Sequence, residues 1–255
     1  MGAQVLRPDG TVFVVGASGH TSIYDTKSKA WTKGPIFPSS PSGDPCTVSD
    51  GPAALLPNGN VLVICSSGFY SYGSFQNGPS LWYEFDGTNL HIQKSPPGDI
   101  GYYSYCYYML VLPTGQILQR PTCQHNKLDF YNPTNMSVQD SWRPLITSFP
   151  EAICPGAKNL RIAGIRLSGM SHGAAYGDDC QTDTNYPLVR ITNEQTKHVF
   201  YCRTHDHSSV AVQSPIISYS YFDVPSGIEL GSSIIEVVAS GIPSLSAPVT
   251  IKSSC

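Results

Sequence analysis

The sequence predicts an all-β protein, with about three blades of a β-propeller followed by a smaller β-sandwich. Three observations predict this fold class. A Pro-x-Gly phrase occurs at residues 8–10, 57–59 and 113–115, and the copies lie 49 and 56 residues apart, a spacing typical of propeller blades. The chain has 23 glycines and 21 prolines but only 13% charged residues, which favours a turn-rich β protein. Convincing helical periodicity is absent from the sequence.

Each copy of the phrase is expected to form the turn of a β-hairpin. Asp9-Gly10 and Asn58-Gly59 suit a two-residue turn, because both central residues must tolerate positive φ, and Thr114-Gly115 occupies the same place in the third copy. A second apolar segment with aromatic residues follows each hairpin, at residues 22–31, 81–86 and 128–142. We therefore predict three small antiparallel sheets within residues 1–144.

The repeat stops near residue 145, and the later strand candidates have the spacing of a small sandwich. These candidates are residues 159–164, 187–191, 198–202, 218–223, 232–239 and 247–251. An Ig-like β-sandwich is therefore predicted for residues 145–255. Closed propellers typically use about 4 to 8 blades. We expect an additional chain or self-association to complete the ring, unless the chain is a fragment of a longer one.

Charge and hydropathy exclude two classes of partner. A net charge of −3 gives no electrostatic basis for binding nucleic acid, and no apolar run approaches the ~20 residues that span a bilayer. The eight cysteines form an even set without a zinc-ribbon pair, which indicates an oxidising compartment. Asn135-Met136-Ser137 is a glycosylation sequon. We therefore expect an extracellular, secreted protein that is glycosylated at Asn135.

Four disulfide bonds are predicted from the eight cysteines. If Thr114 and Gly115 are the two turn residues, Cys106 and Cys123 face each other across the third hairpin, within disulfide range. The other three pairings rest only on nearness in sequence and on domain membership. They are Cys180 with Cys202, Cys154 with Cys255, and Cys46 with Cys65.

Two stretches of the second domain, Ser171–Asp179 and Asn185–Asn193, carry a specific resemblance to a known family. Together with the Leu-Pro-x-Gly blades, they are similar to the galactose oxidase and glyoxal oxidase superfamily. The resemblance implies a kelch-type propeller joined to an early-set Ig-like domain. It covers most of residues 145–255, whereas the blade phrases alone are shared by many propellers.

The enzymes of that family are copper-radical oxidases, so the resemblance implies positions for a copper site. The family places a Tyr-His pair before a Leu-Leu-Pro-x-Gly phrase, and the matching positions here are Tyr105 and Cys106. His172 resembles the histidine that the C-terminal domain supplies. Because the histidine of the Tyr-His pair is missing, we expect a protein without the copper site.

Three histidines are candidates for a different metal site: His172, His205 and His207, with Asp178, Asp179 and Asp206 near them in sequence. Histidines two residues apart share one face of a strand, a spacing that metal sites use. The alternatives are a hydrogen-bonded polar strand end, which we favour, or a sugar contact. Gly177-Asp178-Asp179 also suggests calcium. Copper and calcium are the cofactors considered, and none is expected.

Aromatic residues supply the candidate ligand contacts. Tyr103 and Tyr105 are expected to share one face of a strand, where aromatic rings suit stacking on sugars. Packing between blades is the competing interpretation, and we favour it. A second group lies in a long loop, where propellers place their binding residues: Phe69, Tyr70, Tyr72 and Phe75.

These observations favour a non-catalytic binding protein over an enzyme. The sequence has neither a Gly-x-Ser-x-Gly nucleophile elbow nor a phosphate-binding loop. The expected partner is a glycan or an extracellular protein of the matrix or cell wall. One alternative is a copper-radical oxidase of alcohols or aldehydes with part of its site on a missing segment. The other is a structural subunit of an extracellular assembly.

Overall fold

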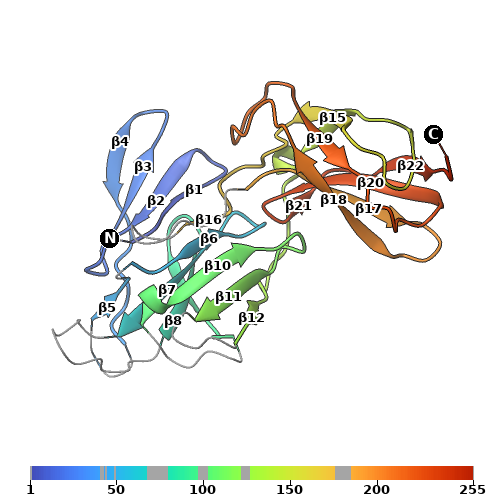
Figure 1. The fold of residues 1–255 in the computed structure, drawn as a ribbon. Helices are drawn as coiled ribbons and strands as arrows, with labels where there is room; N and C mark the ends of the chain where they lie inside the picture. Colours follow the sequence, from blue (N-terminus) through green and yellow to red (C-terminus); the bar gives the residue numbers. More distant parts are fainter. Residues whose placement is uncertain are drawn as a thin grey trace. The chain divides into compact units, whose positions relative to one another are not determined.

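The computed structural model describes residues 2–40, 43, 45–48, 50–67, 80–96, 103–121, 127–175 and 185–254. These residues form strands in four sheets and two short 3-10 helices (Figure 1). None of the helices among them has the length and apolar character to cross a membrane. The chain divides into two compact units, Met1–Ser137 with Ser171–Thr184, and Val138–Met170 with Asn185–Cys255. The predicted all-β fold class is confirmed.

Three antiparallel sheets make up the first unit. The first sheet contains, in chain order, β1 (Gln4–Leu6), β2 (Thr11–Val15), β3 (Thr21–Asp25) and β4 (Ala30–Lys33). The second contains β6 (Ala53–Leu55), β7 (Val61–Ser67), β8 (Ser80–Phe85) and β9 (Leu90–Gln93), with β16 (Ala174–Ala175) beside β6 and β5 (Cys46–Thr47) beside β7. The third contains β10 (Tyr107–Val111), β11 (Ile117–Pro121) and β12 (Asp129–Tyr131). The sequence-based boundary assigned residues 174–175 to the second domain, but β16 extends the second sheet.

The three phrases form hairpin turns, but of a different length from the prediction. In the first, the Gly10 N–H donates to the Arg7 carbonyl (3.0 Å), and the Arg7 N–H donates to the Thr11 carbonyl (2.7 Å). The glycines take the left-handed conformation, with φ of +88° at Gly10, +86° at Gly59 and +83° at Gly115. Each turn is therefore a three-residue loop that ends in a glycine bulge.

This turn geometry corrects the basis of one predicted disulfide. Tyr107 pairs with Pro121, one residue out of step with the register that placed Cys106 opposite Cys123. Cys106 also lies in the 3-10 helix η1 (Ser104–Cys106) and not in a strand. The geometric argument for that bond was therefore wrong, and Cys123 lies outside the described residues.

The second sheet lies between the other two, and both of its faces are buried. Successive residues of β7 point alternately to the two sides, with Val61 and Val63 in the cluster shared with the first sheet. Leu62 and Ile64 lie in the cluster shared with the third sheet. This is why β7 is a continuous apolar run without polar alternation. The sheets stack as propeller blades do, and the prediction of about three blades followed by a sandwich is confirmed.

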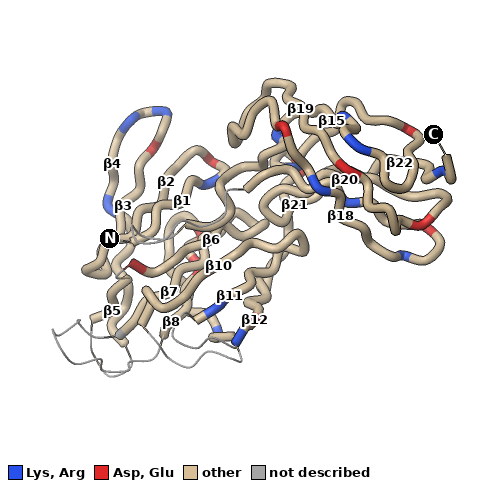
Figure 2. Tube along the Cα trace, viewed as in Figure 1, with Lys and Arg blue, Asp and Glu red and all other residues tan. Residues whose placement is uncertain are grey.

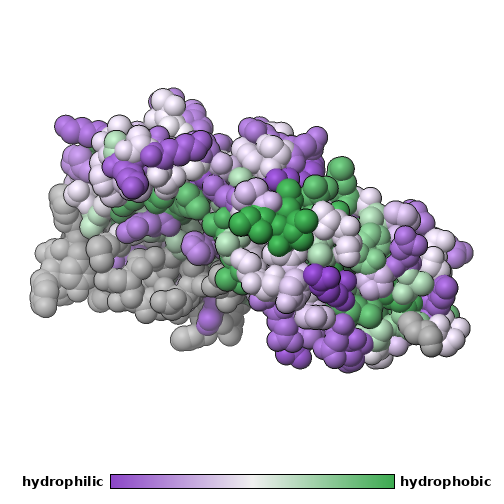
Figure 3. Space-filling view, turned by 90° about the horizontal axis from the view of Figure 1, so that it is seen from above, coloured by the Kyte–Doolittle hydropathy of each residue, from purple (hydrophilic) through white to green (hydrophobic). Residues whose placement is uncertain are grey.

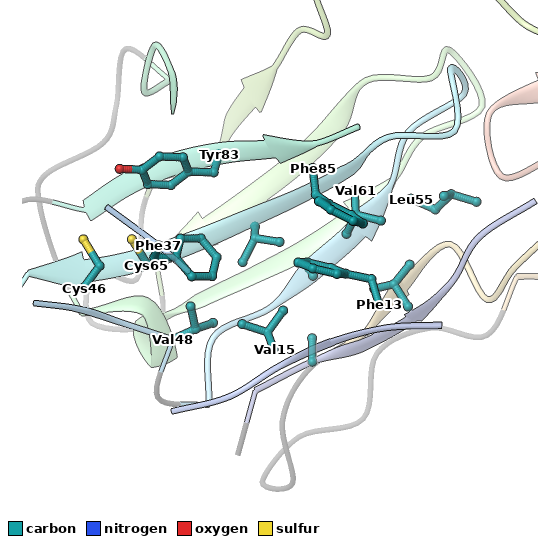
Figure 4. Close-up of a cluster of buried hydrophobic side chains, with 14 residues drawn as sticks. Phe13, Val15, Phe37, Cys46, Val48, Leu55, Val61, Cys65, Tyr83 and Phe85 are labelled. Atoms are coloured by element: carbon teal, nitrogen blue, oxygen red, sulfur yellow. The ribbon is translucent and has the colours of Figure 1, made fainter. Parts of the chain in front are cut away.

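Aromatic pairs join the stacked sheets. Phe13 of β2 stacks on Phe85 of β8, with ring centroids 3.9 Å apart and planes 13° apart (Figure 4). On the other side of the second sheet, Trp82 stacks on Tyr131 of β12 at 5.9 Å and 5°. All four side chains are nearly inaccessible to solvent. Stacked aromatic rings thus join the aliphatic side chains in the apolar contacts between neighbouring blades.

The second unit is a β-sandwich made from one continuous strand order. That order is β13 (Leu145–Ser148), β15 (Leu160–Ile165), β19 (Ser218–Asp223), β18 (Val199–His205), β17 (Leu188–Asn193), β20 (Gly231–Ala239), β22 (Ala247–Ile251) and β14 (Ala152–Ile153), with β21 (Ile242–Pro243) beside β20. The strand β18 takes part in both layers of the sandwich. Its residues 199–202 pair with β17, and its residues 203–205 pair with β19. A buried cluster that includes Ile162, Phe222, Ile191 and Ile235 fills the space between the two layers. A second 3-10 helix, η2 (Asp140–Trp142), precedes β13.

Charged residues are sparse and mixed in sign. Figure 2 shows basic and acidic positions interspersed along the strands of the second unit, without a stripe of one sign. One partly buried ion pair stands out, between Arg190 Nη2 and Glu236 Oε2 at 2.8 Å on neighbouring strands β17 and β20. The described surface therefore lacks the basic footprint that nucleic-acid binding requires.

Candidate functional site

The candidate site is the solvent-facing side of β15, β19 and β18 in the second unit. We call it the His–Tyr face and define it by Arg161, His205, Tyr219, Tyr221 and Asp223. Strand alternation creates it: Phe222 points into the core, whereas Tyr219, Tyr221 and Asp223 are partly exposed on the opposite side. The strand register adds one residue from each neighbouring strand, because Tyr221 pairs with Arg161 of β15 on one side and with His205 of β18 on the other.

The aromatic rings of the face contact one another and a cation. Tyr219 and Tyr221 meet edge to face, with centroids 5.8 Å apart. The His205 ring is nearly parallel to that of Tyr221 at 6.2 Å, with an interplanar angle of 23°. The guanidinium carbon of Arg161 lies 4.5 Å from the Tyr219 centroid, in a cation–π contact. These contacts hold two phenol rings in fixed orientations at a partly solvated surface.

Two carboxylates hold the imidazole of His205. Its Nδ1 lies 2.8 Å from Asp206 Oδ2, and its Nε2 lies 3.3 Å from Asp223 Oδ1. The hydrogen bond to Asp206 is the main reason that the pKa of His205 is raised, and Asp223 adds to the effect. The pKa of Asp223 is lowered, chiefly by the backbone N–H of Asn159 and also by Lys158 Nζ at 3.1 Å. A protonated His205 thus donates to both carboxylates.

His207 has a different environment, which corrects the expectation that the two histidines share a strand face. β18 ends at His205, and Asp206 takes the left-handed conformation with φ of +48°. The Nδ1 atom of His207 is hydrogen-bonded to the hydroxyl of Ser220 at 2.9 Å, and its ring lies 5.9 Å from that of Tyr186. Burial lowers the pKa of His207. The strand-end interpretation therefore describes this pair better than a shared metal site.

Apolar side chains lie beside the His–Tyr face. The loop between β18 and β19 carries exposed Val210, Ile216 and Ile217. Figure 3 shows apolar side chains gathered in a green patch on the surface seen from above. A partly apolar, partly charged surface with fixed rings suits ligands that have both apolar faces and hydroxyl groups.

The predicted histidine metal site stays a prediction, because its three members belong to two different units. His172 is exposed and belongs to the first unit, whereas His205 and His207 belong to the second. The part of the chain that the structure describes contains no group of three histidine, cysteine or acidic side chains placed to hold a metal. The proposed calcium residues Asp178 and Asp179 lie outside the described residues.

The tyrosines predicted to share a strand face instead flank a helical turn. Tyr103 precedes η1 and Tyr105 lies within it, and their rings stack at 5.7 Å and 11°. Tyr103 is buried, and Tyr105 packs against the cluster between the second and third sheets. These contacts give both rings a packing role. The predicted loop contacts Phe69, Tyr70, Tyr72 and Phe75 lie outside the described residues.

The residues matching the family's copper positions do not fit a copper site. Cys106 stands where the family has a histidine, and its side chain is 3% exposed within an apolar cluster that contains Tyr107 and Met109. Tyr105, on the same turn, stacks on Tyr103. A thiol packed among apolar groups and a stacked phenol do not make the nitrogen-and-oxygen ligand set that the chemistry needs.

The structure describes some of the other predicted disulfide cysteines and the glycosylation sequon. Cys154 is disulfide-bonded, and its predicted partner Cys255 lies outside the described residues. Cys202 is a buried free thiol, and its predicted partner Cys180 lies outside the described residues. Burial raises the pKa of Cys202 to about 12. Asn135 is exposed, in a position open to glycosylation.

Comparisons with known proteins give only distant structural likenesses. No family model and no curated protein matches the sequence. Among the solved structures that match is a fungal alcohol oxidase of the AA5 family in complex with copper, at 12% identity and a TM-score of 0.37. The match covers 98% of this chain and 54% of that one, so the chain spans about half the length of the oxidase. At this TM-score we draw no argument from it.

Sequence reasoning found His205 and His207 but missed the rest of the face. Tyr219, Tyr221 and Asp223 alternate along Ser218–Asp223, which is a readable signal for one shared side of a strand. Arg161 could not be found in the same way, because it reaches the face only through the register between β15 and β19.

Proposed function

We propose that this is a secreted, non-catalytic binding protein for glycans, and that the His–Tyr face is its sugar contact. One observation carries the proposal: Tyr219 and Tyr221 are fixed side by side on an outward strand face, flanked by a guanidinium and an imidazole. Sugar rings have apolar C–H faces that pack on aromatic rings, and hydroxyls that pair with charged groups. The face offers both kinds of contact in one place.

Two further observations support binding over catalysis. The positions that match the family's copper ligands hold a buried cysteine and a stacked tyrosine. The ion pairs of His205 hold its ring against two carboxylates, which suits a fixed recognition surface. Secretion and the extracellular setting are supported by the even number of cysteines and by the exposed sequon at Asn135.

A glycan array followed by calorimetric titration tests the proposal. The full chain is expected to bind a defined class of glycans, and Tyr219→Ala or Tyr221→Ala to weaken that binding by about tenfold each, the loss of one stacking contact. Trp31→Ala is the matched control, because Trp31 is a 61% exposed aromatic residue in the first unit. Its affinity should equal that of the parent protein.

Two outcomes would overturn the proposal. One is the absence of binding to any glycan on the array, together with isolation of the native protein as a polymer, which would favour a structural subunit. The other is stoichiometric copper in the purified protein with hydrogen peroxide release on sugar alcohols, which would establish the oxidase alternative. Circular dichroism of each variant separates loss of the contact from loss of the fold.

A further inference from the structure

Two buried cysteines lie side by side in the second sheet, on neighbouring strands. Cys46 belongs to β5 and Cys65 to β7, and the antiparallel register pairs Cys46 with Ser67 and Thr47 with Ser66. Cys65 is therefore the diagonal neighbour of Cys46 on the same face of the sheet. Their exposed fractions are 2% and 0%. In this structure both are thiols, and each shifts the pKa of the other, which is lowered at Cys46 and raised at Cys65.

The two sulfur atoms point to a common place in the core. Figure 4 shows both side chains in the apolar cluster between the first and second sheets, near Phe37 and Tyr83. The two thiols interact with each other in the folded chain, and a covalent bond between diagonal neighbours requires β5 to move toward β7.

The strand β5 contacts both the first and the second sheet, and a disulfide would hold it in that position. It has two residues and, among the described strands, pairs with β7. On its other side, the hydroxyl of Thr47 donates to the carbonyl of Ala17, in the loop between β2 and β3. Gly19 of that loop approaches so closely that an added Cβ would lie 2.4 Å from the carbonyl oxygen of Cys46. This two-residue strand thus contacts both of the first two blades.

We propose that Cys46 and Cys65 form a disulfide in the mature protein, which anchors β5 to β7 at the joint between the first two blades. This inference is independent of the proposed glycan binding. The oxidised bond at Cys154 shows that the chain accommodates disulfides, and the even number of cysteines indicates an oxidising compartment.

The oxidant is a disulfide of a small thiol, of the glutathione disulfide class. One cysteine thiolate attacks it to form a mixed disulfide and releases the first small thiol. The second cysteine then attacks the protein sulfur of that mixed disulfide and releases the second small thiol. Two protein S–H groups are oxidised, one external S–S bond is reduced, and both protons leave on the two small thiols.

The burial of both sulfurs determines at which stage of folding this exchange takes place. Because both sulfurs are almost fully covered in the folded chain, an external disulfide reaches them only before the core closes. The bond therefore forms during folding and is afterwards protected from reductants.

Peptide mapping tests the proposal directly. The full chain, secreted into an oxidising compartment, is denatured without reductant in the presence of an alkylating agent, digested and analysed by mass spectrometry. The expected result is a linked pair of peptides that contain Cys46 and Cys65, with Cys202 alkylated as the internal control. Separate alkylation of Cys46 and Cys65 would overturn the proposal.

A stability comparison distinguishes the bond from the packing of two thiols. Closing a loop of about 20 residues is expected to change the unfolding equilibrium constant by about 100-fold. The double variant Cys46→Ser, Cys65→Ser should lose that factor in oxidising buffer, and should lose much less relative to the parent when both are measured fully reduced. Cys202→Ser is the control, whose effect should not depend on reductant. A loss for the double variant that is equal in both buffers would contradict the disulfide.

Discussion

The hydroxyl of Tyr131 donates a hydrogen bond to the carboxylate of Glu84 across the interface between the third and second sheets, with 2.5 Å between Oη and Oε1. The other carboxylate oxygen accepts from Asn60 Nδ2 at 3.0 Å. Tyr131 and Glu84 are 3% and 4% exposed. Burial, and then the hydrogen bond to Glu84, raise the pKa of Tyr131 well above its usual range. One buried carboxylate therefore links a hairpin turn, the strand β8 and the neighbouring blade.

Removing the Tyr131 hydroxyl should destabilise the first unit. In Tyr131→Phe, Glu84 loses one of its two partners in a site that water does not reach, at an expected cost of about 1–3 kcal/mol. Urea denaturation of the variant and the parent measures the difference. Tyr201→Phe is the matched control, because Tyr201 is 42% exposed, and its change should stay within about 0.5 kcal/mol. Equal free energies of unfolding for the two variants would show that the buried hydrogen bond makes no net contribution to stability.

The glycine bulges predict a second, purely conformational effect. Gly10 has φ of +88°, yet an added Cβ would meet nothing closer than the Thr26 hydroxyl at 3.4 Å. The cost of Gly10→Ala thus arises from the left-handed backbone and should be about 1–2 kcal/mol. Gly10→Asn should cost less, because asparagine tolerates this conformation better than alanine. Gly227→Ala, where an added Cβ meets no atom within 4 Å and φ is not positive, is the control for denaturation measurements.

Sequence patterns predicted the elements better than their pairing. The strands β15, β17, β19, β20 and β22 lie where alternation and spacing placed them. The hairpin phrases were found, but a Pro-x-Gly phrase suits both two-residue and three-residue loops, and only the backbone hydrogen bonds choose between them. That one-residue difference removed the geometric basis for the Cys106–Cys123 bond. Register depends on the turn geometry as well as on the apolar pattern, and the length of the turn was the part that the sequence left open.

For the candidate site, too, the sequence predicted individual residues better than their arrangement in space. His205 and His207 were visible as a polar cluster, but the left-handed Asp206 separates their environments, and no local pattern announces that conformation. The Arg161–Tyr219 contact depends on long-range pairing of β15 with β19. Cross-strand partners far apart in sequence are set by tertiary packing, which a single sequence does not encode as a readable period.

The stacked pair Phe13 and Phe85 should be the strongest single contact between the first two blades. Both rings are fully buried, and Phe85→Ala would leave a cavity opposite Phe13, at an expected cost of about 3–5 kcal/mol. Phe130→Ala is the matched control, since Phe130 is 44% exposed on the third sheet. A double-mutant cycle with Phe13→Ala, followed by chemical denaturation, isolates the contact. Additive effects of the two changes would mean that the rings do not stabilise each other.

The two histidines at the end of β18 should titrate on opposite sides of the ordinary value of 6.5. The hydrogen bond to Asp206, with a smaller contribution from Asp223, raises the pKa of His205, whereas burial and the neighbouring His205 lower that of His207. Nuclear magnetic resonance titration of the ring protons measures both midpoints in one sample. Asp206→Asn should move the His205 midpoint down. Coincident or reversed midpoints in the parent protein would contradict the geometry.

The signs of these shifts also determine how stability depends on pH. A raised pKa means that the folded state holds the His205 proton more tightly than the unfolded state does. The contribution of His205 is therefore fully present below about 6.5 and is lost as the pH rises through its folded midpoint. Asp223, with a lowered pKa, contributes above about 3.8 and loses its contribution as the pH falls through its folded value. In His205→Gln, the decline of stability above about pH 6.5 should shrink relative to the parent, and denaturation midpoints across pH 5 to 8 measure it. A decline of unchanged size would assign the pH dependence to groups outside the His–Tyr face.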